Sequence, residues 1–346
     1  MSRIAIAVAA GSVLLLAACS SEQSQGPTTV RLLTHDSFVV SQSLIDELKA
    51  QTGITLEVNA AGDAGTMVAG AVLAAGSPSA DVMFGVDNTL VSKAADAGVF
   101  SPYTSAEAST LLPALQGDTS DGQVTPIDYG DVCINMDDAW FAKHHLAKPT
   151  SLDQLIQPAY RNLLVVEDPA ASSPGLAFLL ATIAKYGAGW TKYWAALNDN
   201  GVRVSGSWTD AYESSFSASK GTRPLVVSYA TSPPAEIVYA QDPKPVKPST
   251  SVLTDGCYRQ IEFAGVLKGT KNEAAAQQVV DWLLSKPVQA DVPLSMFVFP
   301  ARADTPLPEV FTKFAATVEH PYQLPAADVD AHLKEWLTAW GQVMGR

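Results

Sequence analysis

Positively charged residues are scarce in this sequence of 346 residues, in which 22 Lys and Arg stand against 35 Asp and Glu. The formal net charge is −13, and the basic residues form no cluster. Binding to nucleic acid needs basic side chains that neutralise phosphates, so this class of partner is excluded. An acidic protein attracts cationic small molecules instead.

Several catalytic and membrane-spanning patterns are also missing. The sequence has no Walker phosphate loop, no His-Glu-x-x-His metal motif and no Cys-x-x-Cys pair. Gly62, Gly65 and Gly70 lack the following Gly-Lys-Ser or Gly-Lys-Thr, so we interpret them as turn and helix-packing glycines. After the N-terminus, no stretch reaches the roughly 18 apolar residues of a membrane span. We expect no resident metal and no cofactor.

The N-terminus has the form of a bacterial lipoprotein signal. Arg3 precedes an apolar run over residues 4–15, and Leu-Ala-Ala-Cys ends at Cys19. The apolar run is too short to span a membrane, and the small residues before Cys19 match a lipobox, although an ordinary signal peptide is the alternative. We expect removal of residues 1–18, lipidation of Cys19 and a flexible tether over 19–29. The mature protein is then extracytoplasmic and held to the cell membrane by its lipid anchor alone.

Cysteine is rare, with three residues in the whole chain. Once Cys19 is lipidated, Cys133 and Cys257 remain. An even pair in an oxidising compartment favours a disulfide over two buried free thiols. The bridge would close a loop of more than 100 residues.

The rest of the chain alternates short apolar strands with segments of helical period, which predicts an α/β fold. The first unit has expected strands at 30–33, 54–58 and 80–86, and expected helices at 44–50, at 66–75 and up to Gly98. A second unit follows a predicted turn at 126–130. Its expected strands are 162–167, 225–229 and 258–267, its expected helices are 174–186 and 273–284, and its proline-rich segment 242–248 is an expected exposed loop.

This pattern predicts two doubly wound α/β domains with open, mostly parallel sheets, joined by a hinge as a clamshell. The expected domains are residues 30–126 with 253–300, and residues 127–252 with 301–346. The apolar stripe from Val329 to Met344, which includes Trp336 and Trp340, is expected to pack on the core.

Polar and aromatic residues gather where the predicted strands end, and an open α/β sheet brings such loops to one cleft. Each Asp or Ser before a helix also has a simple alternative role as a cap. The start of the helix at Ser173-Pro174 offers free backbone N–H groups to an anion as well. Carboxylates beside aromatic rings suit a flat cation. The candidate ligand residues are His35, Asp36, Asp63, Asp87, Asn88, Tyr129, Ser172, Ser173, Gly175, Trp208, Tyr229 and Phe297, with Asp128 nearby.

These residues resemble a family, the thiamine-binding solute-binding proteins of ABC transporters, over nearly the whole mature chain. The resemblance lies in the segments His35–Phe38, Ala80–Asn88, Pro126–Gly130, Asp168–Leu176, Trp208–Tyr212 and Ser228–Pro233. It implies a type II periplasmic-binding-protein fold and a monomeric receptor that delivers thiamine or its phosphates to a permease. It also implies ligand contacts from Asp63, Ser172, Trp208 and Tyr229, with the phosphate at the turn 172–175.

The sequence departs from the family at three positions. His35 stands where a tyrosine is usual, Ala235 where another aromatic is usual, and Phe297 where a tryptophan is usual. Other functions therefore stay open. One is a thiamine-cleaving transferase with Cys133 as its nucleophile. Another is a receptor for a different cation such as ferric iron, although ferric binders use adjacent tyrosines and Tyr229 is followed by Ala230.

Overall fold

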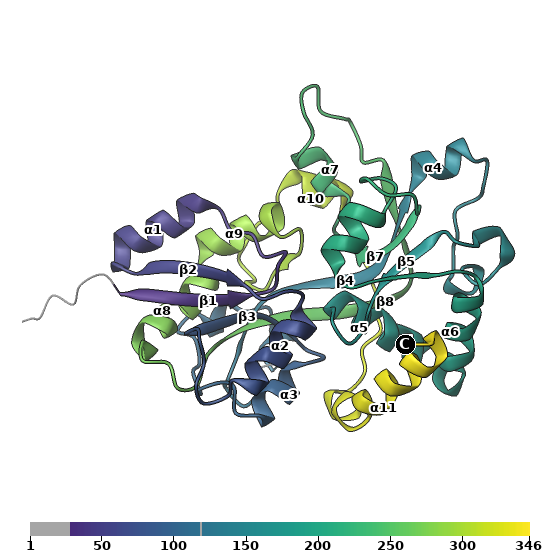
Figure 1. Ribbon diagram of the computed structural model, residues 1–346. Coiled ribbons are helices and arrows are strands. Elements are labelled where there is room, and N and C mark those ends of the chain that lie inside the picture. The colour runs from purple at the N-terminus through teal and green to yellow at the C-terminus, as the bar shows by residue number, and fades with distance from the viewer. Residues whose placement is uncertain (1–27, 118–119) are drawn as a thin grey trace, which may run out of the picture.

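The computed structural model describes residues 28–117 and 120–346, which form two groups of strands and helices on either side of a shared pair of long strands (Figure 1). The predicted signal peptide 1–18 and the lipidation site Cys19 lie outside the described residues. No helix within these two ranges is both long and apolar enough to cross a membrane.

The first group, called here the β1 half, contains the three N-terminal strands. β1 (Thr29–Thr34) pairs in parallel with β2 (Thr55–Ala60) and with β3 (Val82–Asp87). β1 begins at Thr29, one residue inside the predicted tether. All six residues of β3 are buried, as expected of an apolar strand covered on both faces. The helices of this half are α1 (Gln42–Thr52), α2 (Ala64–Leu73), α3 (Val91–Asp96), α8 (Glu273–Leu283) and α9 (Lys286–Ser295).

The second group, called here the β7 half, is built on β5 (Leu164–Glu167), which pairs in parallel with β6 (Arg203–Ser205) and β7 (Leu225–Tyr229). Trp340 is buried against Trp194 with ring centroids 5.7 Å apart, which confirms that the C-terminal stripe packs on the core. The helices of this half are α4 (Asp138–Lys143), α5 (Ser173–Tyr186), α6 (Trp190–Asp199), α7 (Pro234–Val238), α10 (Glu309–Phe314) and α11 (Ala326–Met344).

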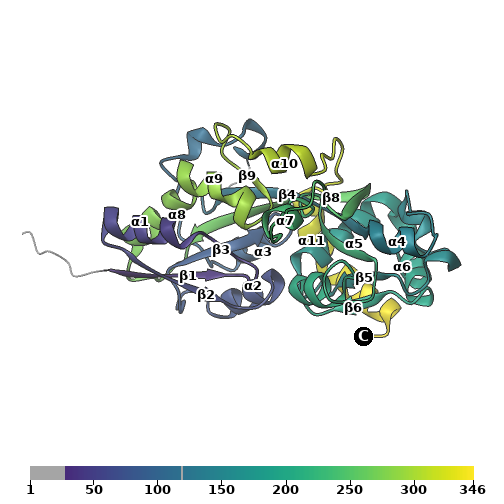
Figure 2. The ribbon, with the colours of Figure 1, turned by 90° about the horizontal axis from the view of Figure 1, so that it is seen from above.

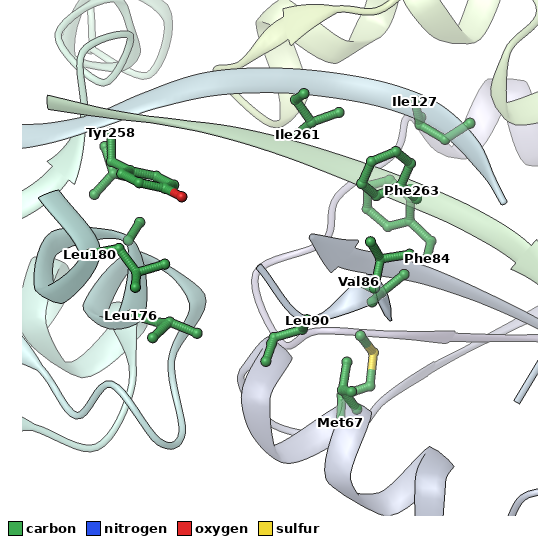
Figure 3. Packing of buried hydrophobic residues seen from close by; sticks show 14 of the residues in the cluster. Met67, Phe84, Val86, Leu90, Ile127, Leu176, Leu180, Tyr258, Ile261 and Phe263 are labelled. Carbon is green, nitrogen blue, oxygen red and sulfur yellow. The ribbon is translucent and has the colours of Figure 1, made fainter. Parts of the chain in front are cut away.

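Two long antiparallel strands, β4 (Thr125–Asp137) and β8 (Thr250–Val266), run through both halves (Figures 1 and 2). β3 pairs with β8 and β7 pairs with β4, so the sheet is continuous in the order β2-β1-β3-β8-β4-β7-β5-β6. A short strand, β9 (Phe299–Pro300), also pairs with β4. Buried apolar side chains accompany the long strands in both halves; Figure 3 shows Phe84 and Phe263 in one group and Leu180 and Tyr258 in the other.

The α/β clamshell prediction is confirmed, but two of its details are wrong. The sheet is mixed rather than mostly parallel, because β4 and β8 are antiparallel to each other and to the strands on either side of them. The segment 126–130 is not a turn but part of β4. A β-bulge at Ile127 interrupts the ladder, which allows Pro126 to lie in the strand without donating a hydrogen bond. The predicted domain boundaries at 126/127 and 252/253 fall inside these long strands, and the division itself stays a prediction.

The predicted disulfide is confirmed, since Cys133 of β4 is bonded to Cys257 of β8. Both residues are buried and pack beside Ala230. The bridge therefore ties the two long strands together within the β7 half. In this state Cys133 has no free thiol, so it cannot act as the nucleophile of a thiamine-cleaving reaction.

Candidate functional site

A cavity of about 430 Å³ lies between the β1 half and the β7 half. This volume is within the range of small-molecule sites. The β1 half contributes the segment after β1, the start of α2, Glu262 of β8 and the segment after α9. The β7 half contributes the start of α5, the segment 208–219, the end of β7 and helix α7.

Seven of the twelve predicted ligand residues line this cavity, which supports the inference that strand ends meet at one cleft. They are His35, Asp36, Asp63, Ser173, Trp208, Tyr229 and Phe297. The other five do not line it. They are Asp87, Asn88, Tyr129, Ser172 and Gly175.

Tyr129 and Asn88 instead have structural contacts. The Tyr129 ring stacks on Phe299 with centroids 5.2 Å apart, and the guanidinium carbon of Arg259 lies 5.0 Å from its centroid. Asn88 accepts from the backbone N–H of Ile261 at 3.0 Å and donates to the carbonyl of Arg259 at 3.2 Å. These contacts hold the loop after β3 and the middle of β4 against β8.

Ser172 and Gly175 are buried at the start of α5. A Cβ added to Gly175 would lie 2.7 Å from the carbonyl oxygen of Glu167, so this glycine permits close packing of α5 on β5. The turn is also covered from the other half, because Thr66 of α2 donates its backbone N–H to the carbonyl of Ala171 at 3.2 Å. α2 thus covers the edge of this turn at Ala171, while Ser173 still lines the cavity, and the phosphate position stays a prediction.

Asp63 connects the two halves. As the N-cap of α2 it accepts from the backbone N–H of Ala64 at 2.7 Å, and its other carboxyl oxygen accepts from the backbone N–H of Trp208 at 2.9 Å. Only 8% of the residue is exposed. Both oxygens thus already accept backbone hydrogen bonds, one from each half, and the contact holds the halves together over the cavity.

Two aromatic pairs form walls of the cavity. Trp208 stacks on Tyr212 with centroids 5.0 Å apart and ring planes 17° apart, and its indole N–H donates to the Ser228 hydroxyl at 3.0 Å. Phe297 meets the ring of Tyr239 at 5.4 Å and 63°. Phe297 has a φ of 54°, a left-handed conformation that is strained for a bulky residue and that tends to occur at ligand-binding positions.

The floor of the cavity is formed by His35, Glu262 and Tyr229. His35 is buried, with Nδ1 2.9 Å from the Ser37 hydroxyl and Nε2 3.4 Å from Oε1 of Glu262. Burial, followed by the nearby Asp128, raises the pKa of Glu262 well above its usual value. Burial and the charge of Glu262 likewise raise the pKa of Tyr229 well above its usual value. Tyr229 is therefore a neutral hydrogen-bonding group in this floor.

Four prominent lining residues were not among the predicted ligand residues: Tyr212, Glu213, Tyr239 and Glu262. One sequence signal could have found Glu262. It is an isolated acidic residue within the apolar run 261–267, and buried carboxylates are uncommon outside functional sites.

The lining is acidic. Asp36, Asp63, Glu213 and Glu262 contribute carboxyl groups, and the lining residues include no Lys or Arg. The pKa of Asp36 is raised by burial and then by the neighbouring charge of Asp63. A cavity with aromatic walls and only acidic charged groups favours a flat cationic ligand.

A two-lobed α/β protein with a ligand-sized cavity between its halves is, by fold and site, a binding protein for a small molecule. The sequence model of the bacterial extracellular solute-binding proteins matches residues 77–317. The chain belongs to this family.

Similarity to individual proteins points the same way. A thiamine-binding periplasmic protein from Escherichia coli K12 is 29% identical over 271 residues, which cover 77% of each chain. The solved structure of a periplasmic thiamin binding protein matches with a TM-score of 0.81 at 24% identity, covering 92% of this chain and 96% of its own. A ferric binding protein from Campylobacter jejuni matches with a TM-score of 0.72 at 18% identity, covering 91% and 99%. Both structures share the fold.

Proposed function

We propose that this protein captures thiamine in the cavity between its halves and delivers it unchanged to an ABC importer. The observation that carries the proposal is a lining that combines two aromatic pairs with carboxyl groups and no basic side chain. Thiamine contains a positively charged aromatic ring, and a ring face over a desolvated cation contributes about 0.5 to 2 kcal/mol. The thiamine-binding relatives named above support the same ligand.

In this proposal Trp208, with Tyr212 behind it, is the main stacking surface, and Phe297 with Tyr239 closes the other side. Asp36 supplies the exposed negative charge. Asp63 keeps the halves closed on the ligand, because its carboxylate joins the start of α2 to Trp208. His35, Ser173 and Tyr229 complete the polar contacts.

We further propose that thiamine is preferred over its phosphates. The lining offers a phosphate no cationic side chain, and two of the four residues of the turn 172–175, Ser172 and Gly175, do not line the cavity. Glu167, directly below that turn, is fully buried, and burial raises the pKa of its carboxyl well above the usual value. The lining thus lacks the cationic side chain that phosphate recognition commonly uses.

Thermal unfolding tests this preference. At 100 times its Kd, thiamine should stabilise the folded protein by about 2.7 kcal/mol, and the melting temperature should rise accordingly. Thiamine monophosphate and diphosphate at the same concentration should give smaller shifts, because each added negative charge meets the acidic lining. Equal or larger shifts with the phosphates would contradict the proposed preference.

We also propose that the protein is a monomer held to the cell membrane through a lipid on Cys19. The Cys19→Ala variant should then lose its acyl chains and leave the membrane fraction, or remain as uncleaved precursor. Metabolic labelling with a fatty acid, followed by fractionation, measures both outcomes. Unchanged acylated protein in the membrane fraction of this variant would refute the anchor.

A further inference from the structure

Three carboxyl side chains share one rung of the sheet beneath the cavity. Asp87 of β3 and Asp128 of β4 both pair directly with Glu262 of β8, which lies between them. We call these three residues the Glu262 rung. Side chains directly opposite on neighbouring strands have Cβ atoms about 4.5 to 5.5 Å apart, and like charges there are destabilising. All three residues are buried, with 5% of Glu262 exposed and less of the other two.

Two β-bulges create this rung. Phe84 of β3 pairs with Ala264 of β8, so a regular ladder would place Val86 opposite Glu262. The bulge at Gly85 shifts the register by one residue and places Asp87 there instead. On the other side, the bulge at Ile127 puts Asp128 opposite Glu262, where Ile127 itself would otherwise stand. Each bulge therefore replaces an apolar neighbour of Glu262 with a carboxyl group. Bulges that re-aim side chains in this way are common beside functional sites.

The bulge at Gly85 also makes room for the histidine of the floor. Gly85 has a φ of +93°, and a Cβ there would lie 2.3 Å from Cδ2 of His35. His35 is therefore placed over the rung by the same feature that places Asp87 in it. Its Nε2 atom is buried and has no hydrogen-bond partner among the described residues.

Three carboxyl oxygens of the rung have no hydrogen-bond donor among the described residues. One oxygen of Asp87 is well satisfied, because it accepts from the backbone N–H groups of Thr89 and Leu90 at 2.7 and 3.1 Å and from the Thr89 hydroxyl at 2.6 Å. Its second oxygen and both oxygens of Asp128 have no donor within the part of the chain that the structure describes. Buried carboxylates without donors are unfavourable unless they take up protons or meet a cation. Glu262 is the member of the rung that lines the cavity.

The groups around the rung provide little compensating positive charge. Besides His35 after β1, the titratable groups that interact with the rung are Asp63 at the start of α2, Tyr229 at the end of β7 and Tyr258 of β8. Asp291 of α9 lines the same small cavity as Asp128 and already accepts hydrogen bonds from Ser41. The cationic neighbour Arg259 of β8 is already paired with Asp131 of β4, with Nε 2.5 Å from Oδ1.

We propose that the Glu262 rung holds a proton that is shared among its carboxyl groups in the empty protein. We propose also that Glu262 recognises a positively charged or N–H-donating nitrogen of the ligand, whose binding displaces that proton to solvent. The inference rests on the proposed function only in its choice of thiamine as the cationic probe. In this proposal the aromatic walls recognise the flat ring of the ligand, and Glu262 in the floor recognises its charged or N–H-donating nitrogen.

The pH dependence follows from this linkage. Burial raises the pKa of Asp128 to about 7 and that of Asp87 to about 6, and it raises the pKa of Glu262 as well. A cation lowers these pKa values on binding, so protons are released and affinity increases with pH. Between pH 6 and 8 the Kd for thiamine should fall, by at most about tenfold per pH unit for each proton released.

Calorimetry of thiamine binding in buffers with different ionisation enthalpies counts the released protons. The wild-type protein should release a measurable fraction of a proton on binding thiamine near pH 7. The Glu262→Gln variant should release less, and its affinity should increase much less between pH 6 and pH 8. Glu57→Gln is the control, because it removes one carboxylate from an exposed position on β2. It should behave as the wild type. Equal proton release by Glu262→Gln and the wild type would overturn the proposal.

A measurement without ligand separates this inference from the proposed function. A group whose folded pKa is raised contributes stability that is present at low pH and lost as pH rises through that pKa. Urea unfolding of the empty wild type should therefore show stability falling from pH 5 to 8 more steeply than in Glu262→Gln, while Glu57→Gln follows the wild type. The same slope in all three proteins would overturn the shared proton. A steep slope in a protein that binds no thiamine would support the rung and refute the proposed ligand.

Discussion

Replacing Trp208 with alanine should weaken thiamine binding by about 2 to 3 kcal/mol, or about 30- to 150-fold in Kd. The ring is half-buried, stacks on Tyr212 and is fixed by the hydrogen bond from its indole N–H to Ser228. The variant loses both the buried area and the cation–π attraction of a pre-positioned surface. Because His35 and Ala235 stand where the resemblance to thiamine-binding proteins leads us to expect aromatic residues, the remaining rings should each contribute more.

Trp336→Ala is the matched control for this variant. Trp336 belongs to α11, is half-buried, and does not line the cavity. Its removal should lower the free energy of unfolding while the folded protein keeps its affinity. Isothermal titration of both variants, alongside urea unfolding, makes the comparison. A Trp208→Ala variant that binds within about twofold of the wild type would contradict the stacking role, since that is under 0.5 kcal/mol.

Removing the bridge between Cys133 and Cys257 should lower the free energy of unfolding by about 5 kcal/mol. The two cysteines are 124 residues apart in sequence, and the chain-entropy model gives this value for a loop of that length. The measurement is urea unfolding of the wild type and of the double variant Cys133→Ala, Cys257→Ala. The loss should also be visible in the wild type when it is unfolded in the presence of reductant.

Ligand affinity distinguishes this structural effect from a catalytic or binding role of Cys133. Neither cysteine lines the cavity, so the double variant should bind thiamine with the wild-type Kd at temperatures where it is folded. Equal unfolding free energies with and without the bridge would contradict its stabilising role. Loss of affinity in a fully folded double variant would instead place Cys133 at the site.

The alternation of strands and helices could be predicted from the sequence because each element is short and has its own apolar period. The long strands β4 and β8 could not. Pro126 interrupts the first and Gly256, with a φ of +82°, lies within the second. Both residues normally end a strand, so the sequence suggested a turn and a strand beginning at Tyr258. Pairing between the two long strands, with bulges at the irregular positions, overrides these local preferences.

The site was predictable where it lies at strand ends, as His35, Trp208 and Tyr229 show. It was not predictable where tertiary packing decides which side chains reach the cavity. Tyr129 sits one residue after Asp128 on a strand whose register a bulge shifts, so alternation alone could not tell which of them faces the floor. Glu262 was missed because it lies in the middle of β8 rather than at its end.

Calorimetric titration of the purified mature protein with thiamine measures whether this cavity binds the proposed ligand. We expect saturable heat from one site per chain, with thiamine monophosphate and diphosphate binding more weakly. Absence of heat together with absence of a thermal shift at millimolar thiamine would contradict the assignment of this cavity to thiamine.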